Sequence, residues 1–325
     1  EVVLFTQGNL NNDIGVPLTL FRLAAEHEYA VLELGANHPG EIAYLTDIAQ
    51  PVVGVVNNAG PAHLEGFGDV PGVAKAKGEL FAGLAADAVC VINADDEFAG
   101  LWNSMAAPRR VISFGLNAVA DVSANWSGDI TGSDVELITP AGTVSLRLAL
   151  PGQHNVMNAL AATAAALAVD ISLEHIVSGL SSMRPVGGRW QLQPGINGAQ
   201  LIDDTYNANP ASLRVALELL SATDAETWLV LGDMGELGEE GERLHSQVGE
   251  QARQARVQRL FALGELAAKA AHTFGSGAEN FTGMDALNAR LEELLHPGVV
   301  VLVKGSRAMH MERVVEALSA DEGDA

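Results

Sequence analysis

The sequence predicts an α/β protein of two domains, a mostly parallel sheet with an antiparallel extension followed by a Rossmann-like doubly wound domain. The chain has 325 residues, whereas a domain with one hydrophobic core usually has about 100 to 200 residues, so two domains are expected. Short β-branched runs alternate with helical patterns along both halves. The segment Arg-Pro-Val-Gly-Gly-Arg at 184–189 separates the halves, because Pro fixes φ and paired Gly widen the accessible backbone. We therefore place the first domain at 1–186 and the second at 187–325.

In the first domain, apolar β-branched runs predict buried parallel strands at residues 31–34, 52–56, 89–92 and 111–114. Alternating apolar and polar residues at 144–150 predict the antiparallel extension. An alanine-rich run at 155–169 and a second run at 173–180 predict two helices that end the domain.

In the second domain, strand and helix patterns alternate, which predicts a doubly wound sheet. The expected strands are 201–203, 228–231, 260–263 and 299–303, and the expected helices are 211–220, 242–255, 284–295 and 307–318. The acidic end at 321–325 is expected to fray.

Composition excludes several classes of protein. The formal charge of −23 argues against a sequence-independent nucleic-acid binder, because neutralising phosphates requires clustered Lys and Arg. The alanine-rich run is shorter than the roughly 20 residues that span a bilayer. The single cysteine, Cys90, lies in an apolar run, and no signal-peptide pattern opens the chain, so neither secretion nor a disulfide framework is indicated. We expect a cytoplasmic monomer with no membrane span and no nucleic-acid partner.

Glu33 and His63 each follow an apolar run, so both are expected at the carboxyl edge of the first sheet, where α/β proteins bind ligands. A carboxylate at the end of an apolar strand is costly unless a cation pairs with it, and two groups at one edge can share a metal ion. Oxygen donors at 65–69 are of the kind that Mg²⁺ prefers. The alternatives are an edge-strand Glu33 that faces water and a solvated His63.

Two pairs of helical residues are further candidates. Lys75 and Lys77 lie in a helix expected to begin near Pro71, and residues two apart do not share a helix face, so at most one points into the site. A solvated surface charge is the alternative for either lysine. Asn155 and Asn158 share a face at the start of the alanine-rich helix, and their amides offer the donor and acceptor that an adenine edge requires. N-capping by Asn155 is the alternative.

Polar clusters follow three strands of the second domain. They are Asp203-Asp204-Thr-Tyr-Asn207, Gly232-Asp233-Met-Gly-Glu236 and Lys304-Gly-Ser306-Arg307. Each alone is compatible with turn chemistry, whereas three at one sheet edge predict a binding site. Lys304 and Arg307 would supply a cationic patch for an anionic substrate.

The common nucleotide fingerprints are missing from the sequence. No G-x-x-x-x-G-K-[ST] occurs, because none of the four lysines precedes Ser or Thr, and no G-x-G-x-x-G follows a strand.

Taken together, eight segments across essentially the whole chain resemble the Mur ligase family. They are GNLNNDIGVPLT from Gly8, ELGANHPGEIAYL from Glu33, NNAGPAHLEGFGD from Asn57, VAKAKGELF from Val73, PGQHNVMNALAA from Pro151, DDTYNANPAS from Asp203, LGDMGELG from Leu231 and VLVKGSRAM from Val301. The first, second and sixth resemble the branch that adds D-alanyl-D-alanine to UDP-N-acetylmuramoyl-tripeptide. The resemblance implies a central ATP-binding domain and a C-terminal ligase domain. The family's N-terminal UDP-binding domain and P-loop have no counterpart here, so we expect the chain alone not to hydrolyse ATP.

The resemblance also implies a chemistry, in which ATP phosphorylates the terminal carboxylate of the tripeptide and the amine of D-alanyl-D-alanine then attacks. It implies that Mg²⁺ is held by Glu33, His63 and Lys77, the last carbamylated by CO₂. Other roles implied by position are catalysis by Lys77, His63 and Arg189, nucleotide contacts by Asn155, Asn158, Arg189, Asp204 and Asn207, and substrate contacts by Asn11, Asn12, Lys304, Ser306 and Arg307.

Two other interpretations stay open. One is another ligase of the Mur or folylpolyglutamate synthase type. The other is a non-catalytic module that binds a nucleotide or a peptidoglycan precursor, although such a module would not need Glu33, His63 and Lys77 together.

Overall fold

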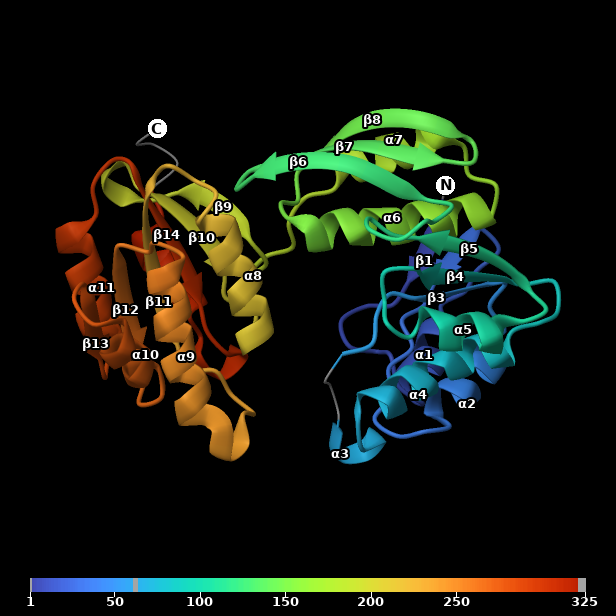
Figure 1. Cartoon of the computed structure of the whole chain (residues 1–325), viewed down its shortest axis with the longest axis horizontal. Helices are drawn as coiled ribbons and strands as arrows, with labels where there is room; N and C mark the ends of the chain where they lie inside the picture. The colour runs from blue at the N-terminus through green and yellow to red at the C-terminus, as the bar shows by residue number, and fades with distance from the viewer. Residues whose placement is uncertain (1, 61–63, 321–325) are drawn as a thin grey trace. The chain divides into compact units, whose positions relative to one another are not determined.

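The computed structural model describes residues 2–60 and 64–320, and the chain divides into two compact units. The first comprises Glu1–Trp126, Val135–Leu146 and His154–Leu180. The second comprises Ser127–Asp134, Arg147–Gln153 and Ser181–Ala325. Figure 1 draws most of the first unit in blue to green and most of the second in yellow to red. The domain boundary between residues 186 and 187 stays a prediction.

The first unit is built on a parallel sheet of three strands, β3 (Val53–Val56), β4 (Val89–Asn93) and β5 (Arg110–Phe114), paired in that order. Strand β4 is buried along its whole length, as a central parallel strand requires. Helices α4 (Val70–Gly83) and α5 (Ala99–Ala106) contribute to the same apolar cluster as the sheet. Trp102 of α5 is buried in this cluster and its Nε1 donates to the backbone oxygen of Ala74 in α4 at 2.9 Å.

A separate parallel pair, β1 (Val3–Phe5) and β2 (Tyr29–Val31), precedes this sheet in the chain. The prediction of a buried strand at 31–34 was wrong, because β2 ends at Val31 and that side chain is 63% exposed. A β-branched apolar run favours extended backbone, whereas burial depends on what covers the strand. Glu33 consequently lies beyond the strand end.

Strands β6 (Ser123–Asp129), β7 (Gly132–Thr139) and β8 (Gly142–Leu148) form a three-stranded sheet in chain order. Two-residue links at 130–131 and 140–141 can join only antiparallel neighbours, which confirms the antiparallel extension. Helices α6 (Gln153–Ala168) and α7 (Leu173–Ser182) follow. Because α6 begins two residues before Asn155, that residue lies inside the first turn, and the N-capping alternative was wrong.

The second unit contains a six-stranded sheet with the order β13-β12-β11-β14-β10-β9. Its strands are β9 (Gln191–Pro194), β10 (Gln200–Asp204), β11 (Glu226–Gly232), β12 (Arg259–Leu263), β13 (Ala278–Phe281) and β14 (Val299–Lys304). All neighbours are parallel except β9 and β10. The helices are α8 (Pro210–Leu220), α9 (Gly241–Gln254), α10 (Ala267–Phe274), α11 (Met284–Leu294) and α12 (Glu312–Leu318).

Alternate residues of β14 enter two different cores. Val300 and Leu302 pack in the cluster that contains α8, α9 and α10, whereas Val301 and Val303 pack in the cluster that contains α11 and α12. Because successive side chains of a strand point to opposite faces, helices cover both faces of the sheet. This confirms the doubly wound domain.

One predicted helix of this unit was wrong. Instead of a continuous helix at 307–318, a short 3-10 turn (Arg307–Met309) precedes α12. His310, with φ of 49°, interrupts the helical path, since this left-handed conformation cannot continue a right-handed helix. Within residues 2–60 and 64–320, no helix is long and apolar enough to cross a bilayer.

Candidate functional site

A pocket of about 530 Å³ opens in the first unit and is lined by residues 11–13 and 35–41 with Tyr44 and Leu45. Asn11 Nδ2 donates to Glu33 Oε1 at 2.8 Å, and the Asn11 backbone oxygen accepts from Gly35 N at 2.8 Å. Asn12 Oδ1 accepts from the backbone N–H of Gly15 at 2.8 Å, at the start of α1 (Gly15–Leu20). The structure thus brings Asn11 and Asn12 together in the pocket lining, and Glu33 joins them through its hydrogen bond from Asn11.

The pocket wall at residues 37–40 is held by two carboxylates that sequence reasoning missed. Glu41 Oε2 accepts from Asn37 N at 2.7 Å and His38 N at 3.2 Å, and the bond from Asn37 contributes most to lowering the pKa of Glu41. Glu79 of α4 accepts from Gly40 N at 2.9 and 3.0 Å. Because Glu79 lies two residues after Lys77, one helix supports both the pocket wall and the predicted carbamylation site.

Lys77 is half-buried on α4, and Lys75 is exposed on another face of the same helix. The Lys77 ammonium donates to the backbone oxygen of Asn58 at 2.8 Å. Burial lowers the pKa of Lys77, and the nearby negative charge of Asp96 opposes that effect. Of the two lysines, Lys77 therefore occupies the environment that favours a neutral, reactive amine.

The loop that Lys77 contacts is the one that follows β3. Asn57 Nδ2 donates to Asn158 Oδ1 at 2.9 Å, and the Asn57 backbone oxygen accepts from Asn93 Nδ2 at 2.8 Å. Asp96 Oδ2 accepts from Ala59 N at 2.9 Å. Residues 57–59 therefore link Lys77 on α4 to Asn158 on α6. Half-buried Asn155 lies one turn before Asn158.

The chemistry of Glu33 suits a divalent cation. Its exposed carboxylate accepts from Asn11, and no Lys, Arg or His within the described chain forms an ion pair with it. A carboxylate with no cation partner is an oxygen donor of the kind that Mg²⁺ takes. His63 lies outside the described residues, and no cluster of three or more His, Cys, Asp or Glu occurs within them.

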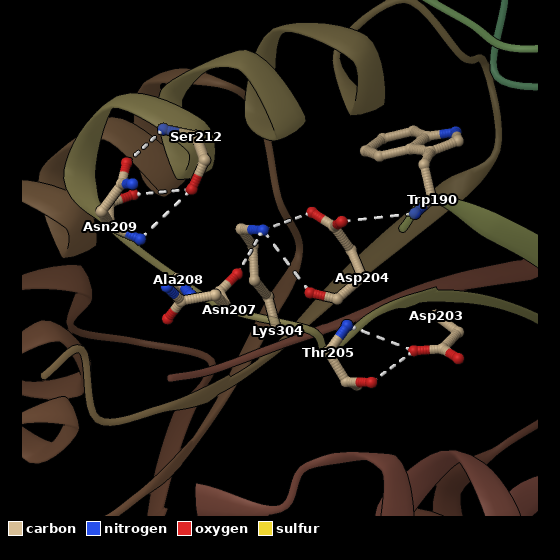
Figure 2. Close-up of polar contacts among 9 residues, drawn as sticks. All are labelled: Trp190, Asp203, Asp204, Thr205, Asn207, Ala208, Asn209, Ser212 and Lys304. Atoms are coloured by element: carbon tan, nitrogen blue, oxygen red, sulfur yellow. Dashed lines mark hydrogen bonds and ion pairs between the residues drawn. The ribbon is translucent and has the colours of Figure 1, made fainter. Parts of the chain in front are cut away.

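In the second unit the carboxyl ends of β14 and β10 meet through Lys304, as Figure 2 shows. The Lys304 side chain is 3% exposed, and its ammonium donates to Asp204 Oδ2 at 2.5 Å and to the backbone oxygen of Asn207 at 2.9 Å. Burial raises the pKa of Asp204 and the Lys304 charge opposes that rise. Arg307 is exposed and pairs with Glu312 at 3.4 Å. The prediction of a cationic patch formed by Lys304 and Arg307 was therefore wrong, because the Lys304 charge is buried and paired.

Residues 187–190 lie against the end of β10. Asp204 Oδ1 accepts from Trp190 N at 3.2 Å, and Tyr206 N donates to the Gly188 backbone oxygen at 2.9 Å. Gly188 has φ of +73°, and a Cβ there would lie 3.0 Å from Tyr206 N, so this approach requires glycine. The Arg189 guanidinium lies 4.2 Å from the centre of the Tyr206 ring, a cation–π contact. Arg189, Asp204 and Asn207 are thus brought together.

The end of β11 joins the same edge. Ser306 N donates to the Asp233 backbone oxygen at 3.0 Å, and Asp233 Oδ1 accepts from Ala267 N at 2.7 Å. Buried His245 accepts from Met234 N at 2.9 Å and so holds the loop after β11. The sequence did not predict this contact, because a single histidine in a helical pattern gives no sign of its partner. All three polar clusters predicted from the sequence therefore lie at the carboxyl edge of one sheet.

Protein-family comparison matches both units. Residues 1–166 match the Mur ligase middle domain, and residues 188–307 match the Mur ligase glutamate ligase domain.

Individual relatives agree with this match. The UDP-N-acetylmuramoyl-tripeptide–D-alanyl-D-alanine ligase of Escherichia coli K12 is 45% identical over 320 residues, covering 97% of this chain and 70% of the relative. The ligase of the same name from Bacillus subtilis is 33% identical, covering 96% and 69%. A crystal structure of MurF from Acinetobacter baumannii superposes with a TM-score of 0.89 at 36% identity, covering 97% and 70%. The MurF ligase of Thermotoga maritima, solved with ADP, gives 0.82 at 26% identity, covering 97% and 73%.

Proposed function

The chain belongs to the Mur ligase family, and from that premise we propose that it joins D-alanyl-D-alanine to UDP-N-acetylmuramoyl-tripeptide in peptidoglycan precursor synthesis. It is an ATP-dependent acid–amino-acid ligase. The observation that carries the proposal is the 45% identity to a ligase of this specificity over 97% of the chain, which takes in both units. Fold likeness alone would leave the substrate open, because related folds serve different substrates.

The proposed reaction has two steps. The γ-phosphoryl group of ATP passes to the terminal carboxylate of the tripeptide, which gives an acyl phosphate and ADP. The amine of D-alanyl-D-alanine attacks the acyl carbon, loses a proton and displaces inorganic phosphate as the amide bond forms. Such a sequence depends mainly on positioning and on neutralising phosphate charge.

Residues of the first unit would serve the carboxylate and the metal. Asn11 and Asn12 line the pocket and are proposed to contact the peptide. Mg²⁺ would be held by Glu33, His63 and Lys77 after carbamylation, and it would neutralise phosphate charge. Carbamylation converts the Lys77 cation to an anion, which removes the repulsion that a lysine would otherwise exert on a metal. Asn155 and Asn158 are proposed to contact adenine.

Residues of the second unit have proposed roles of their own toward the nucleotide and the substrates. Arg189, stacked on an aromatic ring, supplies an exposed guanidinium suited to phosphate. Asp204 and Asn207 are proposed to meet the nucleotide from the end of β10, and Ser306 and Arg307 to meet the peptide substrate. We further propose that the enzyme acts as a monomer in the cytoplasm, where nucleotide-linked precursors and ATP are found together.

Phosphate release by the complete enzyme, measured with a panel of amine acceptors, tests this assignment. D-Alanyl-D-alanine is expected to give the fastest ATP- and tripeptide-dependent release. Faster turnover with glutamate would assign the chain to another ligase of the same superfamily. Tight nucleotide or precursor binding without any turnover would instead support the non-catalytic binding module.

A further inference from the structure

The ammonium of Lys304 has no hydrogen left for a ligand. A lysine ammonium carries three N–H donors, and Lys304 has three acceptors in the structure. They are Asp204 Oδ2 at 2.5 Å, the backbone oxygen of Asn207 at 2.9 Å and the backbone oxygen of Asp204 at 3.4 Å. The side chain is 3% exposed and that of Asp204 is 17% exposed. A ligand could reach this charge only after the pair had been broken.

The same contacts connect Lys304 to the groups around it (Figure 2). Asp204 uses one carboxylate oxygen for Lys304 and the other for the backbone N–H of Trp190, next to Arg189. Lys304 donates to the backbone oxygen of Asn207 and so fixes the position of this residue in the loop. The side-chain oxygen of Asn207 accepts from Ala208 N at 2.8 Å. Lys304 therefore fixes both segments from which the second unit presents Arg189 and Asn207.

We propose that Lys304 is a positioning residue that organises the proposed nucleotide-binding segments through Asp204 and Asn207, and that it does not contact substrate. The identity of the bound nucleotide rests on the proposed function, whereas the positioning itself does not. A buried lysine whose partner carboxylate is half-buried cannot be removed without leaving a poorly compensated charge, so the segments should loosen when Lys304 is replaced.

Hydrogen exchange on the ligand-free enzyme tests the positioning directly. Lys304→Met is expected to raise amide exchange in peptides covering residues 187–207 by about tenfold or more, and Lys304→Arg, which keeps the charge, by less. The matched control is Val299→Ala, which opens a cavity at the opposite, buried end of the same strand. Val299→Ala should lower overall stability while leaving exchange in 187–207 in line with the rest of the unit.

Steady-state kinetics provide the second measurement. A positioning role predicts that Lys304→Met raises the KM for ATP by about tenfold, whereas the KM for D-alanyl-D-alanine changes by less than about twofold. Adding Asp204→Asn to Lys304→Met removes the unpaired charge but does not replace the lost bonds to Asp204 and Asn207, so amide exchange in residues 187–207 should stay above that of the wild type. If Lys304→Met does not fold, Lys304→Arg decides the question by the same two measurements.

A rise in the KM for tripeptide or D-alanyl-D-alanine, with normal exchange in 187–207 and an unchanged KM for ATP, would make Lys304 a substrate ligand and overturn the inference. A wild-type enzyme that binds ADP but forms no amide bond would instead overturn the proposed function. In that case hydrogen exchange and the dissociation constant for ADP still decide the role of Lys304.

Discussion

The carboxylate of Glu79 supports the wall of the first-unit pocket, and we predict that Glu79→Ala lowers the free energy of unfolding by about 2 kcal/mol. Its oxygens accept from Gly40 N at 2.9 and 3.0 Å and from Ala43 N at 3.3 Å, at the start of α2 (Glu41–Ala49). A hydrogen bond to a charged group contributes roughly 1.5 to 3 kcal/mol, and a negative charge at a helix N-terminus about 0.3 to 1. Glu79 is half-buried, so solvent screening reduces the sum. Glu79→Gln keeps an acceptor and should cost about 1 kcal/mol.

Urea unfolding of the complete enzyme measures the loss as a lower midpoint at constant m-value. The KM for the UDP-linked tripeptide should rise several-fold more than the KM for ATP, because residues 37–40 line the pocket. Asp47→Ala is the control, since it removes an exposed carboxylate from the same helix α2 and should stay within about 0.5 kcal/mol of wild type. The reasoning fails if Glu79→Ala is as stable as wild type, or if Asp47→Ala loses as much as Glu79→Ala.

Three further predictions concern the first unit. Lys77→Ala is expected to abolish most ligase activity while the fold survives, and added short carboxylic acids should restore part of that activity. Lys75→Ala, at an exposed position, should change kcat by less than about twofold. A larger loss of activity in Lys75→Ala, or a loss that short acids rescue, would reverse the choice of lysine. For Asp95, burial raises the pKa, but hydrogen bonds from the backbone of residues 116–118 prevail and hold it below the ordinary value. Because the folded pKa is lowered, the ionised carboxylate stabilises the fold at pH values above the unfolded pKa of about 4, and this contribution is lost as the pH falls through the folded pKa. The urea midpoints of wild type and Asp95→Asn should therefore differ most at neutral pH and converge as the pH falls below the unfolded pKa; a constant gap would contradict this. Gly66→Ala would place a Cβ 1.9 Å from a backbone oxygen and should lower the free energy of unfolding by about 1 to 3 kcal/mol. Gly100→Ala, where a Cβ would meet nothing within 4 Å, should leave stability unchanged or raise it. Equal melting temperatures for the two variants would count against the clash at Gly66.

Sequence patterns predicted the second unit well because its elements are strongly periodic. The run at 299–303 became β14 with one added residue, and the polar ends of β10, β11 and β14 met at one edge as expected. Patterns were weaker where burial depends on distant parts of the chain. The apolar residues near Val31 predicted a buried strand, but the residue is exposed. Strand β13 and helix α10 were missed, since short elements give little periodic signal.

The site showed the same limit. Sequence position predicted that the polar ends of β10, β11 and β14 share one sheet edge, whereas the roles of Lys77, Asp204 and Arg189 stay predictions. Hydrogen-bond partners were not predictable, because Glu79, Asn57 and His245 act on groups that only the fold brings near. Lys304 is the clearest case, since a lysine after a strand predicts an exposed cation and only the packing of β10 beside β14 buries it.

The place of β14 in its sheet sets an order on folding. Gln200 of β10 pairs with Val300, and Glu226 of β11 pairs with Val299. Strand β14 is therefore synthesised after both of the strands that pair with it. Contacts of such long sequence separation carry a high loop-closure cost and slow the folding of a domain. During synthesis, β10 and β11 must remain without their shared neighbour until residues 299–304 leave the ribosome. The second unit therefore orders residues 187–207, the proposed nucleotide-binding segments, in the same late event that completes its core.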